Sequence, residues 1–219
     1  MRLAAAAAER LGWPALPALA VLLLVLRPLV RENGPAETAL ALLYASLCAG
    51  TVLCARSVAV GRRLGLAAPV AWFGVVVVAR AGDARWLDAL ALLSTLWITA
   101  QVTLVAVETV LARRLSGRDA LAAAAFGYLM LALAWAQLYI VMELWSPGAF
   151  RGPDGEVSAA ELTHLSMVTI TTLGYGDVVP VAPLARVLAG LQAMVGTLYV
   201  AVVIGRIVSD MAPGGRDGR

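Results

Sequence analysis

Residues 171–177 read Thr-Thr-Leu-Gly-Tyr-Gly-Asp, and this segment, called here the glycine loop, constrains the fold more than any other part of the chain. Gly174 and Gly176 flank Tyr175, so the backbone can adopt conformations that residues with a Cβ avoid. Successive carbonyl oxygens can then turn to the same side of the chain, and the Thr172 hydroxyl adds one more oxygen. The sequence therefore predicts a loop that presents a row of oxygen ligands.

The residues on both sides of the glycine loop predict helices. Ser158 and Glu161 form a Ser-x-x-Glu pattern, in which each side chain satisfies a free backbone amide at a helix start. A helix over 159–171 would be about 20 Å long at ~1.5 Å per residue, half the thickness of a membrane. The carboxyl-terminal end of this helix, which is the negative end of its dipole, would then point towards the place where cations collect. Pro180 and Pro183 suit a rising loop, and a long apolar stretch begins near Ala182.

This order of half-length helix, glycine loop and long helix resembles the pore of the potassium channel family. Thr172-Leu173-Gly174-Tyr175-Gly176 matches the selectivity filter of that family, in which rings of carbonyls replace the water shell of the ion. Leu173 stands where valine is common. The resemblance covers residues 158–209 and implies a tetrameric, six-transmembrane channel of the prokaryotic type. A Gly-Tyr-Gly turn alone would indicate no more than an ordinary loop.

The resemblance also implies a role for each residue of the glycine loop. It assigns the potassium sites to the backbone carbonyls of Thr172, Leu173, Gly174 and Tyr175, with the Thr172 hydroxyl innermost. Gly174 and Gly176 permit the backbone conformation, and the Tyr175 ring braces the loop against the preceding helix. Asp177 lies at the outer mouth, and Thr171 packs behind the loop.

The supporting residues behind the loop differ from the family pattern. His164, Leu165 and Val168 occupy positions where the family often has tryptophan or glutamate to hold the aspartate. Two interpretations of His164, the single histidine of the chain, stay open at this point. It either makes a pH-sensitive contact with Asp177, or it bonds to backbone or water near the outer interface.

The last apolar stretch is predicted to line the pore. Gly196 lies where the family places a glycine at which the inner helix can bend. Val200, Ile204 and Val208 follow at spacings of i, i+4 and i+8 and share one helix face. This face either narrows the cytoplasmic end and gates by dewetting, or it is an ordinary packing stripe.

Composition makes the chain an integral membrane protein. Hydrophobic residues form 61% of it and its mean hydropathy is +0.85, whereas soluble domains are ~45–50% apolar. We predict an all-α fold with a re-entrant half-helix and six spans of roughly 17–25 residues. The predicted spans are 11–30, 37–55, 64–79, 86–112, 120–145 and 182–209. The first is expected to be a retained helix; a signal peptide is its alternative.

The charges predict the orientation. With six spans, eleven of the 17 arginines lie on the side of both termini and six on the other side. Because positive residues favour the cytoplasm, we expect a multi-pass protein of the cell membrane with cytoplasmic termini. Four acidic residues lie near the predicted outer mouth and would attract cations; they are Asp154, Glu156, Glu161 and Asp177. Nucleic acid binding is not expected.

The chain divides into three predicted parts. Residues 1–118 form a four-helix membrane domain in the place of a voltage sensor, but 86–112 contains no arginine. Residues 119–211 form the pore domain, whose outer helix ends in a predicted interfacial belt of Tyr139, Glu143 and Trp145. Residues 212–219 are expected to be a flexible tail, too short for a ligand-binding domain.

These features predict a passive potassium channel that is not steeply voltage-gated. One glycine loop per chain supplies one wall of a cage, so closure requires symmetric association, and the resemblance implies a ring of four copies. The expected partners are the lipid bilayer and potassium, the permeant ion. A less selective cation channel and a non-conducting membrane subunit are the alternatives. Cys48 and Cys54 are expected to be packing residues, and no enzyme activity, cofactor or other metal is expected.

Overall fold

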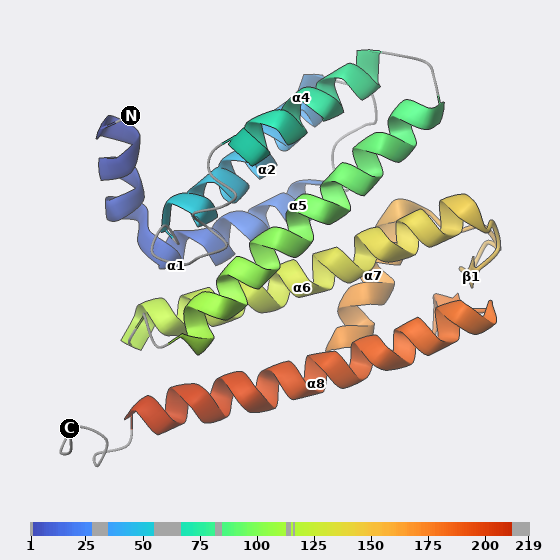
Figure 1. Cartoon of the computed structure of the whole chain (residues 1–219). Coiled ribbons are helices and arrows are strands. Elements are labelled where there is room, and N and C mark those ends of the chain that lie inside the picture. Colours follow the sequence, from blue (N-terminus) through green and yellow to red (C-terminus); the bar gives the residue numbers. More distant parts are fainter. Residues whose placement is uncertain are drawn as a thin grey trace.

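The computed structural model describes residues 2–27, 35–54, 67–81, 85–112, 115 and 117–211 (Figure 1). The predicted tail 212–219 lies outside them. Four helices come first: α1 (Arg2–Leu26), α2 (Pro35–Cys54), α4 (Ala67–Ala81) and α5 (Arg85–Leu111). In α1, Gly12 adopts φ 53° and ψ −175°, and Pro14 follows. This non-helical residue divides α1, and the part before it stands at an angle to the rest (Figure 1).

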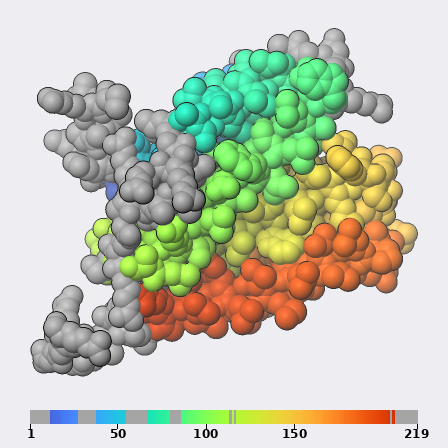
Figure 2. Space-filling model, in the orientation of Figure 1, coloured from blue at the N-terminus to red at the C-terminus, as the bar shows by residue number. Residues whose placement is uncertain are grey.

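The second half of the chain builds the region around the glycine loop. Its elements are α6 (Gly117–Trp145), β1 (Phe150–Arg151), α7 (Ala159–Ile170), β2 (Val179–Pro180) and α8 (Pro183–Met211). The short helix α7 lies between α6 and α8 (Figure 1) and contacts both. In the space-filling view, α6 shows between α5 and α8 (Figure 2). Helix α6 is therefore the central element, in contact with α1, α5, α7 and α8.

One apolar core joins the amino-terminal helices to α6. It includes Trp13 of α1, Trp72 of α4, Val102 of α5 and Phe126 of α6, all buried. Two hydrogen bonds join helices within this bundle: the Trp72 Nε1–H donates to Thr95 Oγ1 at 2.9 Å, and Tyr44 bonds to Thr99. Interhelical hydrogen bonds of this kind hold helices together where no water is present. Helices α1 and α5 thus pack against α6 of their own chain, and α2 and α4 pack on α1 and α5.

Both cysteines have the packing role that the sequence predicted. Cys48 is buried in the same core and Cys54 packs against it, and both are free thiols.

Three helices have the length and composition of a membrane span among the described residues. They are 86–111, 117–145 and 183–203, with 26, 29 and 21 residues. They coincide with the last three predicted spans. The apolar parts of α1, α2 and α4 (12–26, 38–54 and 67–79) are shorter than 18 residues. The six-span arrangement therefore stays a prediction, whereas a mostly helical chain with three apolar helices long enough to span a membrane is confirmed.

The all-α prediction missed a pair of short strands. Strand β1 pairs antiparallel with β2, with Phe150 opposite Pro180 and Arg151 opposite Val179. Beside them, the Ala149 carbonyl accepts from the amides of Val181 and Ala182 at 2.8 and 3.0 Å. This pairing ties the segment before α7 to the segment after the glycine loop.

Candidate functional site: the glycine loop and its supports

Helix α7 begins with the predicted capping box. The Ser158 amide donates to Glu161 Oε2 at 2.7 Å, and the Glu161 amide donates to Ser158 Oγ at 3.2 Å. Helix α7 has 12 residues and ends at Ile170, one residue before the predicted end. The hydrogen bond from the Ser158 amide, and then that from its hydroxyl, lower the pKa of the Glu161 carboxyl below its ordinary value of 4.5.

This capping box gives a prediction for pH. Because the pKa of Glu161 is lower in the folded protein than in the unfolded chain, ionised Glu161 stabilises the fold above pH 4.5. That contribution is lost as pH falls below 4.5 and through the lowered pKa. The thermal midpoint of the purified protein, measured from pH 7 to pH 3, should therefore fall less in Glu161→Gln than in the parent. Equal slopes in both proteins would contradict the role of the carboxylate.

The sign of the backbone angle φ alternates along the glycine loop. Thr172, Gly174 and Gly176 have φ of 58°, 55° and 80°, whereas Leu173 and Tyr175 between them are not in the positive region. Only glycine adopts such φ values freely, and the sequence has glycine at two of these three positions. The positive φ of Thr172 was not foreseen, because β-branched residues rarely adopt it. Alternation of this kind lets successive carbonyls turn to one side of the chain.

The carboxyl end of α7 holds the first residues of the loop. The Val168 carbonyl accepts from the amides of Leu173 and Gly174 at 2.8 and 3.1 Å. The Thr171 hydroxyl donates to the Met167 carbonyl at 2.8 Å. Thr171 thus turns its side chain back towards α7, as expected for a residue behind the loop. Its neighbour Thr172 donates its amide to the Thr169 carbonyl at 3.0 Å.

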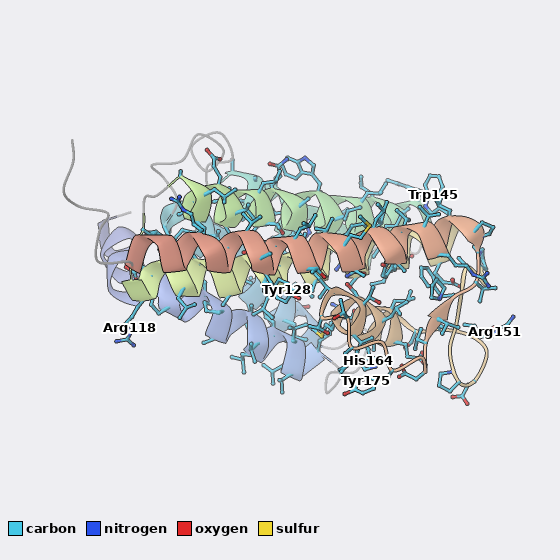
Figure 3. The ribbon with its side chains drawn as sticks, turned by 90° about the horizontal axis from the view of Figure 1, so that it is seen from below. Arg118, Tyr128, Trp145, Arg151, His164 and Tyr175 are labelled. Atoms are coloured by element: carbon cyan, nitrogen blue, oxygen red, sulfur yellow. The ribbon has the colours of Figure 1, made fainter. Side chains whose placement is uncertain are left out.

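His164 contacts the outer end of the loop. Its Nε2 lies 3.1 Å from Asp177 Oδ2, and its ring is parallel to that of Tyr175 with 5.9 Å between the centroids (Figure 3). Nε2 is covered from solvent and makes no aligned hydrogen bond, so it meets Asp177 by close contact alone. The sequence left two interpretations of His164 open, and the structure agrees with the one in which His164 contacts Asp177. The pH sensitivity of that contact stays a prediction.

Two residues behind the loop are apolar and buried, whereas the loop itself is exposed to solvent. Leu165 and Val168 are buried on α7, next to His164. All residues of 171–177 are exposed in the single chain, with Tyr175 at 68% and Leu173 at 57%. One chain therefore leaves the whole glycine loop uncovered, and the role of its oxygens as ion ligands stays a prediction. Among the described residues, no group of three His, Cys, Asp or Glu side chains could hold another metal.

Gly196 lies against the end of α7. An ideal Cβ on Gly196 would be 2.3 Å from the Ile170 carbonyl oxygen, which also accepts from the Tyr128 hydroxyl at 2.8 Å. Helix α8 continues through this position from Pro183 to Met211. The structure thus gives Gly196 a packing role that the sequence did not predict, and the bend at Gly196 stays a prediction.

The predicted gate is described only in part. Val200 is 40% exposed. The side chains of Ile204 and Val208 lie outside the described residues, so the gate also stays a prediction.

The predicted interfacial belt is wrong for Tyr139. This residue is fully buried, and its ring lies 5.0 Å from that of Phe150. Trp145 is 74% exposed at the end of α6 (Figure 3). Glu143 has a structural use: its carboxylate accepts from the amides of Gly148 and Phe150 at 2.7 and 3.1 Å. The sequence placed Tyr139 at the interface wrongly because the side chain that it bonds to, Gln192, is 53 residues away in the chain.

Comparison with known proteins gives a matching family model and two similar relatives. A family model described as "Ion channel" matches residues 127–212. Potassium voltage-gated channel protein shk-1 of Caenorhabditis elegans is 34% identical over 77 residues, which are 32% of this chain and 14% of that protein. Protein LctB of Bacillus caldotenax is 30% identical over 89 residues, which are 38% of this chain and 66% of that protein.

These matches are partial. The chain thus spans less than two thirds of the length of both relatives. No solved structure matches the chain. The region from α6 to α8, with the glycine loop at its centre, is therefore similar to known ion channels, and these matches support an ion channel family for this membrane protein.

Proposed function

We propose that the chain forms a potassium-selective channel from four identical copies, with the glycine loops facing a common axis. The observation that carries this proposal is the alternation of φ at Thr172, Gly174 and Gly176 in a fully exposed loop. Rings of carbonyls from four such loops would replace the hydration shell of potassium. The ligands are the carbonyls of Thr172, Leu173, Gly174 and Tyr175, with the Thr172 hydroxyl.

Two further observations support this function. The ion channel family model covers the loop, the long helix after it and the part of α6 from residue 127 onwards, and the printed name of one relative is that of a potassium channel. The ligands are supported by neighbouring residues that do not coordinate the ion themselves: Thr171, Gly176, Asp177 and His164. The bend at Gly196 and the gate formed by Val200, Ile204 and Val208 belong to this proposal.

Weak voltage dependence is also part of the proposal. The helix α5 has no arginine after Arg85. Because each charge that crosses the field contributes ~2.3 kcal/mol per 100 mV, a helix without a series of arginines lacks the charge that steep gating needs. The first four helices then serve as a membrane domain packed on α6, and both termini lie in the cytoplasm of the cell.

Recording from the reconstituted protein tests the proposal. In planar bilayers with opposed tenfold gradients of potassium and sodium, we expect a reversal potential near the potassium equilibrium value, about 59 mV from zero. A less selective cation channel would reverse near zero, and a non-conducting subunit would pass no current. The mass of the detergent-solubilised protein should correspond to four chains; a monomer would contradict the ring.

A further inference from the structure

A buried chain of hydrogen bonds joins the three helices around the glycine loop. It consists of Tyr139 on α6, Ser166 on α7 and Gln192 on α8, here called the Gln192 network. The relative exposure of each residue is 0%. The Tyr139 hydroxyl donates to Gln192 Oε1 at 2.5 Å, and Gln192 Nε2 donates to Ser166 Oγ and to the Ser166 carbonyl at 2.7 and 2.9 Å. The Ser166 hydroxyl donates to the Ala132 carbonyl at 2.6 Å.

The donors and acceptors of this network allow one arrangement. The Gln192 amide has two N–H donors and one carbonyl acceptor, and all are used here. If the amide turned over, its oxygen would face the Ser166 carbonyl, and two acceptors would meet without a proton. The Ser166 hydroxyl gives its proton to Ala132, so it can only accept from Gln192. Because an unpaired polar group is costly in a dry interior, the network fixes the position of α7 between α6 and α8.

Helix α7 carries this position directly to the glycine loop. Ser166 lies two residues before Val168, within the same helix. The Val168 carbonyl holds the amides of Leu173 and Gly174, whose own carbonyls are proposed potassium ligands. A shift of α7 along or about its axis therefore moves the ligands, with no flexible segment between Ser166 and Val168 to absorb it.

We infer that Gln192 is a positioning residue for ion selectivity, acting through Ser166 on the spacing of the loop carbonyls. The inference rests on the proposed function, because discrimination between potassium and sodium depends on the size of the carbonyl cage or on the number of carbonyls that reach the ion. Gln192 touches no ion in this scheme. It fixes the position of α7, and α7 in turn fixes the loop residues whose carbonyls are the proposed ligands.

A role in stability alone is the competing explanation. Interhelical hydrogen bonds also act as simple glue between membrane helices. Their loss would then lower the thermal midpoint of the oligomer and leave the permeability ratio of the surviving channels unchanged. The two roles are separable, because selectivity is measured only on channels that have assembled.

The test uses three variants of the full chain in planar bilayers. Gln192→Met keeps the length of the side chain and removes the amide, Tyr139→Phe removes one hydroxyl, and Ser166→Ala removes the hydroxyl on α7. Thr163→Val is the matched control, since its hydroxyl donates to the Ala159 carbonyl within α7 and reaches no other helix. The sodium-to-potassium permeability ratio comes from the reversal potential, and the thermal midpoint is measured in parallel.

We expect Gln192→Met to raise the permeability ratio about tenfold, equivalent to ~1.4 kcal/mol, with smaller rises in Tyr139→Phe and Ser166→Ala. The double variant Gln192→Met/Tyr139→Phe should equal Gln192→Met alone, because the Tyr139 hydroxyl acts through Gln192. Thr163→Val should match the parent.

Two outcomes would overturn the inference. One is an unchanged ratio in assembled Gln192→Met and Tyr139→Phe channels, even if their thermal midpoints fall. The other is an equal change in Thr163→Val. If Gln192→Met does not assemble, Tyr139→Phe and Ser166→Ala decide by the same criterion. A parent protein that conducts without selectivity would instead refute the proposed function.

Discussion

Replacing Gly174 by alanine is expected to abolish potassium conduction while the protein still folds and assembles. Gly174 has φ of 55°, a conformation that costs a residue with a Cβ ~1–2 kcal/mol. In a ring of four chains the cost reaches at least ~4 kcal/mol, so the population of the conducting loop conformation should fall about 1000-fold. Folding should be spared, because a Cβ on Gly174 meets no atom within 4 Å.

Gly74→Ala is the matched control for this change. Gly74 lies within helix α4, and an added Cβ meets nothing there either. Alanine at that position is a better helix former than glycine by ~1 kcal/mol, so conduction and stability should be retained. The measurement is rubidium uptake into proteoliposomes that contain equal amounts of oligomer. Uptake by Gly174→Ala at the level of the parent would refute the assigned loop conformation.

Replacing Gly196 by alanine is expected to destabilise the assembled protein and to reduce conduction. The new Cβ would lie 2.3 Å from the Ile170 carbonyl oxygen and 2.7 Å from Ile170 Cγ1. A Cβ has no rotamer by which to avoid a backbone atom, so α8 must move away from α7. Overpacking of this kind costs ~1–3 kcal/mol in each chain, and it acts beside Thr171 and Thr172 at the inner end of the loop.

Gly190→Ala on the same helix separates this contact from a general effect of alanine in α8. A Cβ on Gly190 meets no atom within 4 Å, so the thermal midpoint of Gly190→Ala should be equal to or above that of the parent. Gly196→Ala should melt at a lower temperature and take up less rubidium per oligomer. If both variants melt together, the close contact between α7 and α8 is wrong.

Local sequence signals predicted the parts of the site that local chemistry determines. The capping box of α7 depends on residues three apart, Ser158 and Glu161, and the glycine conformations depend on the absence of a Cβ. The last three spans follow from length and apolar composition. In each case the residues that decide the structure are neighbours in the chain, so a pattern in the sequence suffices.

The sequence could not predict the contacts between remote segments. Ser166 bonds to Gln192 and to Ala132, which are 26 and 34 residues away, and no spacing rule relates them. The strand pair of β1 and β2 has two residues in each strand, too few for an alternating pattern. The positive φ of Thr172 opposes the preference of its own residue type, so only the surrounding structure can impose it.

The core shared by α1, α4, α5 and α6 has a consequence for protein engineering. Ala123, Phe126 and Met130 of α6 are buried against the amino-terminal helices. A chimaera that joined residues 117–211 of this protein to the leading helices of another membrane protein would lose the partners of these side chains. Transplanted segments should therefore begin before α1 or be redesigned along the whole inner face of α6, and a crossover placed between α5 and α6 is the least suitable choice.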